Sequence, residues 1–395
     1  MTSQRATLES FAQRMWRMTR MQELPADHPF LKPLETLQDN AARAGKQFVS
    51  FAQYDYLDLS GHPAVRQAAK DAIDEQGTGV GASRLVGGER IGHRMLEREL
   101  AEFLGFDDAL ALISGYLTNE SLIRTLMHGA DAVFYDELSH NSIISGVNGG
   151  RYHSAAFPHN DLDALAAMLT ARRGEFRNVL VIVEGLYSMD GDIPDLPRLL
   201  ELKERHGFWL MVDEAHSHGV LGATGRGLAE HFGVDPRGID VVVGTLSKTF
   251  VSAGGIIAGS QALIDLLRYS LGGFIYSVGL PPASVAAARK ALAILRAEPE
   301  RIAAMARNGK MFADICRTAG LSVGTAIGRG VVPVMLGDEN TVYYASETLR
   351  AEGIQAPPIL VIGVPRAGPR IRFFVTAAHS KQDMDRTVAV MARFK

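Results

Sequence analysis

The stretch FWLMVDEAHSHG (208–219) decides the fold, because five apolar residues run directly into an acidic pair and a histidine-rich turn. An apolar run of this length without alternation predicts a strand buried on both faces, which is typical of a parallel sheet. Similar runs recur between segments of helical periodicity: ALALIS (109–114), DAVFYDE (131–137), VLVIVEG (179–185), VVVGTLS (241–247) and GGIIAGS (254–260). This alternation predicts an α/β fold with a large, mostly parallel sheet.

The pattern changes near residue 282. A long helical stretch (283–320) precedes two apolar strands, VVPVMLG (331–337) and RIRFFVTAAH (370–379), and a final helix. These elements predict a smaller α+β domain. The expected division of the chain is therefore an N-terminal arm (1–60), a large domain (61–285) and a small C-terminal domain (286–395).

Composition excludes several classes of protein. The 41 basic and 44 acidic residues give a net charge of -3, which offers no field for a nucleic acid partner. Cys316 is the single cysteine, so we expect neither an internal disulfide nor a cysteine-rich metal site. The lack of cysteine pairs suits a reducing compartment, and we therefore expect a cytoplasmic location. We expect no metal site, secretory signal or membrane span, and we expect the amphipathic start to pack on a partner subunit.

Polar residues follow the apolar runs, where the strands of an open parallel sheet present their ligand-binding ends. Asp213 ends one run, and a buried carboxylate at this point requires a cationic or protonated partner. The protonated pyridine nitrogen of pyridoxal phosphate would serve, as would a salt bridge or a helix cap. Other strand ends carry further candidates: Ser114, Gly115, Tyr116, Asp136, His140, Glu184, His216, Ser247 and Lys248.

Lys248 follows the run VVVGTLS by way of a small polar turn, where burial would lower the pKa of its amine as a Schiff base requires. Thr245 and Ser247 could offer hydroxyls to a phosphate. Ser114-Gly115-Tyr116 lies between a strand and a helix and could offer backbone N–H groups. The segment around Lys248 lacks the spacing of a P-loop, and the glycine-rich segment 77–93 lacks that of a dinucleotide fingerprint.

Taken together, these segments resemble the α-oxoamine synthase family, a branch of the aspartate aminotransferase-like enzymes of fold type I that depend on pyridoxal phosphate. The resemblance covers about residues 28–390. It is carried by GxGxxxSR (77–84), SGYLTN (114–119), DELSHNS (136–142), FPHND (157–161), EGLYSMDGD (184–192), DEAHS (213–217), GTLSK (244–248), FIYS (274–277) and RIRFFVTAAH (370–379).

The resemblance implies a role for each site residue. Lys248 would form the internal aldimine and act as the base, Asp213 would pair with the pyridine nitrogen, His216 would hydrogen-bond the ring hydroxyl and His140 would stack on the ring. The cofactor phosphate and its surroundings would involve Ser114, Gly115, Tyr116, Thr245, Ser247, Glu184, Ser188 and, from the partner subunit of a homodimer, Ser277.

Substrate contacts are implied at Arg372, which would hold the amino acid's carboxylate, and at Tyr54 and Arg84. Arg370, two residues before Arg372, is expected to point away from it. His159 in FPHND could cap or brace a loop as easily as enter the site.

The implied reaction is a decarboxylative condensation of a small amino acid (serine, alanine or glycine) with an acyl thioester, carried on coenzyme A or on an acyl carrier protein. Tyr54 and Ser217 favour the serine palmitoyltransferase branch, and other segments resemble polyketide-associated members. The alternatives are an 8-amino-7-oxononanoate synthase of biotin synthesis and a different fold type I enzyme, such as an aminotransferase. A non-catalytic subunit would lack Lys248.

Two departures from the family pattern concern the site. The family's Tyr-Leu-Gly is Tyr56-Leu57-Asp58 here, which replaces a residue that readily adopts positive φ. A second hydroxyl that often follows Ser277 is Val278. We expect an altered acyl entrance and a weaker grip on the phosphate.

Overall fold

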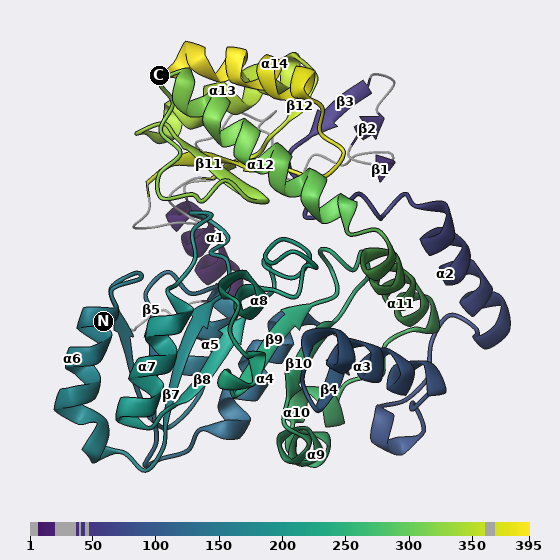
Figure 1. Cartoon of the computed structure of the whole chain (residues 1–395), viewed down its shortest axis with the longest axis vertical. Helices are drawn as coiled ribbons and strands as arrows, with labels where there is room; N and C mark the ends of the chain where they lie inside the picture. The colour runs from purple at the N-terminus through teal and green to yellow at the C-terminus, as the bar shows by residue number, and fades with distance from the viewer. Residues whose placement is uncertain (1–6, 20–36, 39–40, 44–46, 360–367) are drawn as a thin grey trace.

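A seven-stranded sheet forms the centre of the larger part of the molecule (Figure 1). The computed structural model describes residues 7–19, 37–38, 41–43, 47–359 and 368–395. The strands of this sheet are β4 (Asp108–Leu112), β5 (Ala132–Asp136), β6 (His153–Phe157), β7 (Val179–Glu184), β8 (Trp209–Asp213), β9 (Val241–Thr245) and β10 (Gly255–Gly259). Their order is β4-β10-β9-β8-β7-β5-β6, and β10 alone pairs antiparallel with its neighbours. The predicted α/β class with a mostly parallel sheet is confirmed.

The sequence prediction missed β6. Apart from the buried Phe157 its residues, HSAA, are small or polar and form no apolar run, since this strand lies at the edge of the sheet and is only partly buried.

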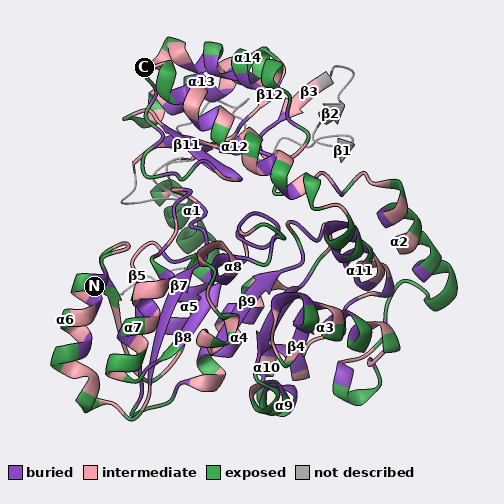
Figure 2. Cartoon of the chain, in the orientation of Figure 1, coloured by how far each residue is buried: buried purple, intermediate pink, exposed green. Residues whose placement is uncertain are grey.

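Helices cover both faces of the sheet, and we call this assembly the sheet body. It contains α2 (Pro63–Gln76), α3 (Ile91–Leu104), α4 (Gly115–Leu126), α5 (Asn141–Asn148), α6 (Leu162–Arg172), α7 (Leu196–His206), α8 (Leu228–Phe232), α9 (Gln261–Ser270), α10 (Gly272–Ile275) and α11 (Pro282–Ala297). Alternate residues of each central strand enter opposite cores. Val181 packs in one core with Leu199 of α7, and Ile182 packs in the other with Leu122 of α4. Figure 2 shows the strands buried between these layers.

A second core lies in what we call the small body, drawn at the top of Figure 1. Its elements are β3 (Gln47–Ser50), α12 (Glu300–Thr318), β11 (Val331–Met335), α13 (Glu339–Ala351), β12 (Ile354–Gln355), β13 (Pro358–Ile359), β14 (Arg370–Phe374) and α14 (Lys381–Met391). The sheet order β11-β14-β13 is antiparallel throughout. The single predicted helical stretch 283–320 is two helices, because Pro299 follows the end of α11 and precedes α12.

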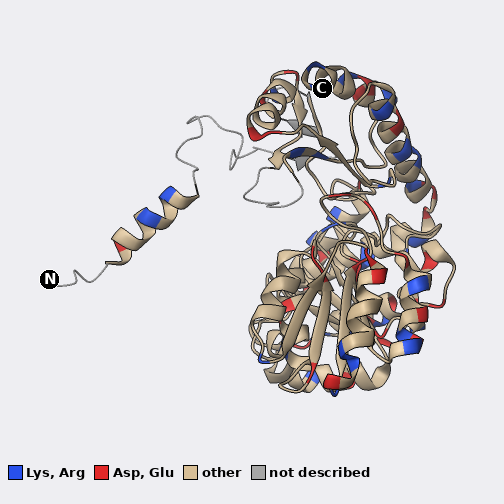
Figure 3. Cartoon of the chain, turned by 90° about the vertical axis from the view of Figure 1, so that its left-hand side faces the viewer, with Lys and Arg blue, Asp and Glu red and all other residues tan. Residues whose placement is uncertain are grey.

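The N-terminal part of the chain reaches the small body through β3, which pairs in parallel with β12. Two further short strands, β1 (Leu37–Gln38) and β2 (Ala41–Arg43), extend the same sheet. The first helix, α1 (Leu8–Met18), has no buried residue, and Figure 3 shows it apart from both bodies. Its packing on a partner subunit and the division of the chain at residues 60 and 285 stay predictions.

No helix in the described ranges is both long and apolar enough to cross a lipid bilayer.

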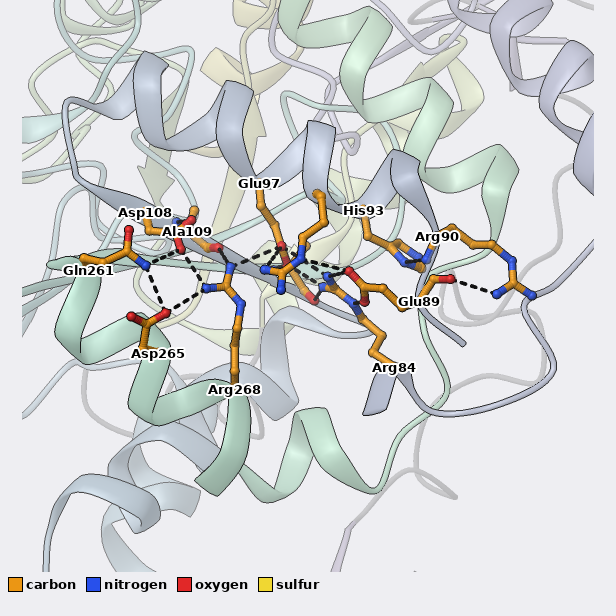
Figure 4. Close-up of polar contacts among 12 residues, drawn as sticks. Arg84, Glu89, Arg90, His93, Glu97, Asp108, Ala109, Gln261, Asp265 and Arg268 are labelled. Carbon is orange, nitrogen blue, oxygen red and sulfur yellow. Dashed lines mark hydrogen bonds and ion pairs between the residues drawn. The ribbon is translucent and has the colours of Figure 1, made fainter. Parts of the chain in front are cut away.

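A buried ion-pair network ties the segment 84–97 to the edge of the sheet (Figure 4). Glu97 of α3 accepts hydrogen bonds from Arg84 and from the backbone N–H of Ala111 in β4, the latter at 2.9 Å. Arg268 of α9 lies 3.4 Å from Glu97 and 2.7 Å from Asp108. The Glu97 side chain is about 1% exposed, so two guanidinium groups depend on a carboxylate that water does not reach.

We predict that Glu97→Gln lowers the free energy of unfolding by about 3 kcal/mol, because it removes the buried carboxylate that Arg84 and Arg268 share. Glu102→Gln on the same helix is the matched control, since Glu102 pairs with Arg296 at the exposed surface. Denaturant unfolding of both variants measures the difference. Equal midpoints for the two variants would contradict the stabilising role of the network.

Candidate active site

The carboxyl ends of the parallel strands open into a cavity of about 510 Å³. Tyr54 and Arg372 close the cavity from the side of the small body. The structure brings together in its lining all but two of the predicted site residues: Tyr54, Ser114, Gly115, Tyr116, His140, Glu184, Ser188, Asp213, His216, Thr245, Ser247, Lys248 and Arg372. The topology explains the convergence, because strands that are distant in sequence end at one rim.

Lys248 follows β9 and is half-buried among charged groups. Burial lowers the pKa of its amine to about 8, although the charges of Asp213 and Glu184 act in the opposite direction. Its Nζ lies 5.6 Å from the centre of the Tyr54 ring. A substantial fraction of this amine is therefore neutral near pH 8, which a nucleophile or a base requires.

Asp213, at the end of β8, is buried and accepts two hydrogen bonds. Asn119 Nδ2 donates to its Oδ2 at 2.6 Å, and the backbone N–H of Ala215 donates to its Oδ1 at 2.9 Å. Asn119 was not among the residues predicted for the site. Its spacing was the available signal, since it follows Gly115 by four residues and so lies on the same face of α4.

A chain of hydrogen bonds continues from Asp213 to His140. Asn119 Nδ2 also donates to Ser142 Oγ at 2.9 Å, and this oxygen lies 2.7 Å from His140 Nδ1. The backbone N–H of His140 donates to Glu184 Oε1 at 2.5 Å. Burial and the neighbouring charge of Asp213 raise the pKa of Glu184 well above its usual range. The ring of His140 is held at one edge while the rest of it remains exposed to the cavity.

His216 is buried beside the cavity, with its Nδ1 2.7 Å from the Tyr56 hydroxyl. Burial, with the cations Lys248 and Arg372 nearby, holds the pKa of His216 well below its usual range, so the ring is neutral. Nδ1 is the partner found for the Tyr56 hydroxyl among the described residues, and a buried hydroxyl proton requires an acceptor. Tyr56 therefore donates to Nδ1, and His216 carries its proton on Nε2.

The N-terminus of α4 forms one end of the cavity. Ser114 caps this helix, and Gly115 and Tyr116 begin it. A Cβ at Gly115 would come within 2.8 Å of Thr245 Oγ1, so a side chain there would fill the space beside the hydroxyl. Thr245 Oγ1 and Ser247 Oγ lie 2.8 Å apart. Free N–H groups, a helix N-terminus and two hydroxyls suit a phosphate.

Arg372, from β14, forms the opposite end. Its guanidinium lies 4.5 Å from the Phe374 ring centre, and its Nη1 donates to the Ser188 carbonyl at 3.1 Å. Burial lowers the pKa of Arg372, and the Tyr54 hydroxyl opposes that shift. Its Nε is buried without a hydrogen-bond partner, and no carboxylate of the described chain pairs with it. Such a guanidinium is suited to bind a carboxylate from outside the chain.

The expectation that Arg370 points away from Arg372 is wrong. Residues i and i+2 of a strand share a face. Arg370 is fully buried and donates to the Met189 carbonyl at 2.9 Å, beside the contact of Arg372 with Ser188.

Arg84 and Ser277 are the two predicted residues outside this cavity. Arg84 is buried in the ion-pair network with Glu89 and Glu97 (Figure 4), so in this chain its guanidinium does not reach the cavity. Ser277 lies between the exposed side chains of Tyr276 and Val278.

Asp58, where the family pattern has glycine, adopts the left-handed conformation at φ 57°. Aspartate tolerates this region better than most residues, so the turn after Tyr56 is kept without glycine.

The cavity fits pyridoxal phosphate: an amine for its aldehyde, a buried carboxylate for its pyridinium nitrogen, and an anion site for its phosphate. Together with the order of the sheet, these groups define a pyridoxal-phosphate-dependent enzyme of fold type I.

Comparison with known proteins agrees. The family model for aminotransferases of class I and II matches residues 46–391. An 8-amino-7-oxononanoate synthase of Symbiobacterium thermophilum is 39% identical over 366 residues, covering 92% of this chain and 93% of that protein. The enzyme of the same name from Fervidobacterium nodosum is 40% identical, covering 86% and 87%.

Solved structures of serine palmitoyltransferase are also similar. The Sphingomonas wittichii enzyme has a TM-score of 0.89 at 28% identity, covering 97% of this chain and 95% of that one. A serine palmitoyltransferase from S. paucimobilis with bound PLP–myriocin aldimine has a TM-score of 0.92 at 27% identity, covering 98% of both. The chain belongs to the class I and II aminotransferase family. Within it the chain is an α-oxoamine synthase that uses pyridoxal phosphate, as the resemblance implied.

We predict that the rate at which the apoprotein takes up pyridoxal phosphate rises with pH through a midpoint of about 8. Below this pH the Lys248 amine is protonated and does not attack an aldehyde; above it the amine is neutral. The change in cofactor absorbance at a series of pH values measures the rate, with Lys248→Ala as the blank. A midpoint near 10, as for an ordinary lysine, would contradict the site's effect on this amine.

Tyr56→Phe tests the tautomer of His216. Nitrogen NMR of the histidine-labelled apoprotein at pH 8, with His216→Gln for assignment, should show the Nε2–H form in the parent protein and a mixture in the variant. Loss of this hydrogen bond should cost about 1 kcal/mol, roughly a fivefold loss of cofactor affinity. An Nδ1–H form in the parent protein would overturn the assignment.

Proposed function

We propose that this enzyme joins a small L-amino acid to an acyl thioester with loss of carbon dioxide, giving an α-amino ketone and a free thiol. The observation that carries the proposal is one cavity lined by the Lys248 amine, the buried Asp213 carboxylate and the Arg372 guanidinium, which pairs with no carboxylate of the described residues. The names of the relatives reported above, 8-amino-7-oxononanoate synthase and serine palmitoyltransferase, support it.

Pyridoxal phosphate, when bound, supplies an electron sink that stabilises a carbanion at the amino acid's α-carbon. Asp213 would accept a hydrogen bond from the pyridinium nitrogen, with Asn119 fixing the direction of the carboxylate. His216 would donate its Nε2–H to the ring oxygen, and His140 would offer its exposed ring face. Gly115, Tyr116, Thr245 and Ser247 would hold the phosphate at the N-terminus of α4.

Lys248 would take the α-proton of the amino acid, because its amine is neutral in part at physiological pH and lies in the cavity. Arg372 would hold the amino acid's carboxylate through its guanidinium, which lines the cavity, and so orient the α-carbon toward the amine. The centre of the Tyr54 ring lies 5.6 Å from Lys248 Nζ, and Tyr54 also lies near the Arg372 guanidinium. A large side chain on the amino acid substrate would contact this ring. His140 would polarise the oxygen of the thioester carbonyl.

A homodimer is part of the proposal, with Ser277 acting in the partner's site. Ser277 follows Tyr276, which is 88% exposed, and the next residue, Val278, forms an isolated antiparallel β-bridge with Ser83. This bridge brings Leu85 and Val86, which are also exposed, close to the same segment. An exposed apolar surface of this kind suits a second copy of the chain. A cytoplasmic setting is also proposed, supported by the free thiol of Cys316.

Two candidate pairs of amino acid and acyl thioester are supported by different observations. Tyr54 supports a serine palmitoyltransferase-like pair: serine, alanine or glycine with a long acyl group on coenzyme A or an acyl carrier protein. The named relatives support the second candidate, formation of 8-amino-7-oxononanoate. The structure of that product divides into alanine without its carboxylate and a seven-carbon acyl group that ends in a carboxylate.

We predict that Arg372→Ala raises the dissociation constant of the amino acid ten- to a hundredfold, the loss typical of a charge-assisted hydrogen bond of about 1.5–3 kcal/mol. Bound cofactor should be retained, because the contacts of Arg372 are with Ser188, Met189 and Phe374 and not with the residues proposed to hold the phosphate. Spectral titration of the holoenzyme measures both. Unchanged amino acid affinity would remove Arg372 from substrate binding.

Substrate choice is tested by spectral titration with serine, alanine and glycine, followed by thiol release from two thioesters. We expect thiol release that depends on the amino acid, with either a long alkyl thioester or the seven-carbon ω-carboxylated one. Preference for the latter with alanine would establish the second candidate. Amino-group transfer to a keto acid without thiol release would instead show an aminotransferase and contradict the proposal.

A further inference from the structure

The segment 188–192 lies between the sheet body and the small body and contacts both. It follows β7 after Glu184, and it folds back on itself: the N–H of Tyr187 donates to the Asp192 carbonyl at 3.0 Å, and the N–H of Gly191 donates to the Tyr187 carbonyl at 2.9 Å. We call this segment the brace. Its contacts with both bodies are polar and largely buried.

His159 holds the brace on the side of the sheet body. Its Nδ1 lies 2.9 Å from Oδ1 of the fully buried Asp136, and its Nε2 lies 3.0 Å from Asp192 Oδ2. An ionised carboxylate only accepts hydrogen bonds, so a ring between two of them must donate from both nitrogens and is an imidazolium. Burial alone would lower the pKa of His159, but Asp136 and Asp192 outweigh it and raise the pKa to about 10.

Among the described residues, the ion pairs of Asp136 and Asp192 are those with His159. The Tyr187 ring packs edge-on against the imidazole, with ring centres 4.5 Å apart. The same Asp192 Oδ2 also accepts a hydrogen bond from Thr325 of the small body at 2.7 Å. Asp192 is therefore the point where His159 of one body and Thr325 of the other meet.

The small body grips the remainder of the brace. Arg370 Nη1 donates to the Met189 carbonyl at 2.9 Å and lies 2.7 Å from Asp190 Oδ1. The N–H of Ile327 donates to the Gly191 carbonyl at 3.0 Å. Gly191 has φ +69°, and a Cβ there would come within 2.4 Å of the Val331 carbonyl, so the backbones pack too closely for any other residue.

Arg372 makes its protein contacts at the other end of the brace. Its Nη1 lies 3.1 Å from the Ser188 carbonyl and 3.2 Å from the Met189 sulfur. These contacts fix one edge of the guanidinium and leave Nε without a partner in the described chain. The direction of Arg372 therefore depends on where residues 188 and 189 lie.

We propose that His159 is a positioning residue that acts through Arg372: as a cation between Asp136 and Asp192, it holds the brace, and the brace aims the Arg372 guanidinium into the cavity. This inference rests on the proposed function only for the ligand of Arg372, which is the amino acid's carboxylate. The hold on the brace is a property of the protein alone. His159 does not line the cavity and contacts no reacting group.

Hydrogen exchange of the holoenzyme tests the hold without any substrate. His159→Gln should increase amide exchange at least tenfold at Tyr187, Gly191 and Ile327, whose N–H groups close the brace. His128→Gln is the matched control, because His128 is exposed and lies before β5, away from the brace. Exchange at these amides that is unchanged in His159→Gln would overturn the proposal.

A double-mutant cycle tests the consequence for binding. His159→Gln should raise the dissociation constant of the amino acid about tenfold, and it should have less than a twofold effect in the Arg372→Ala background. The KM for the acyl thioester should stay within twofold. Equal effects of His159→Gln in both backgrounds would show that His159 acts elsewhere and would overturn the proposal.

Thr325→Val provides a milder variant if His159→Gln folds poorly. It removes the hydrogen bond from the small body to the same Asp192 oxygen, and it should shift the same amides and the same dissociation constant in the same direction. No shift in either would count against the brace. If Arg372→Ala alone leaves amino acid affinity unchanged while exchange rises in His159→Gln, the brace holds and the substrate role of Arg372 fails.

Discussion

The site is organised around a buried carboxylate, Asp213, that forms no ion pair with the described residues. Asp213 ends β8 with its oxygens held by Asn119 and by a backbone N–H, and no ion pair with it occurs in the described residues. Arg372 lines the same cavity and has a buried nitrogen, Nε, without a partner among the described residues. Burying such groups costs free energy unless a ligand completes them. Both groups line one cavity, where a protonated nitrogen beside Asp213 and a carboxylate beside Arg372 would satisfy them.

The sequence predicted the fold well where strands were buried on both faces. All six apolar runs form strands of one sheet, and five of them run parallel to one another as expected. The remaining strand, β6, was missed because an edge strand needs no apolar run. The break between α11 and α12 could have been predicted from Pro299, because proline is disfavoured inside a helix. The reversal of β10 could not be predicted, because direction within a sheet depends on connections rather than on composition.

Single residues at strand ends were predictable, but their partners were not. Lys248, Asp213 and His216 followed from apolar runs and from family resemblance, whereas Asn119 and Tyr56 act by reaching across from other elements. Arg84 shows the converse: a residue of a family motif whose charge is used in a buried network. Arg370 and His159 likewise contact the brace from distant parts of the chain, and no local sequence pattern predicts these contacts.

The central claim is that Lys248 is the amine that carries the cofactor. Reduction of the purified holoenzyme with borohydride, followed by proteolysis and mass spectrometry, tests it directly, since reduction makes a lysine–cofactor bond permanent. A phosphopyridoxyl group on the peptide that contains Lys248, and on no other lysine, is the predicted result. A label on a different lysine, or no label in protein that still releases thiol from its substrates, would contradict it.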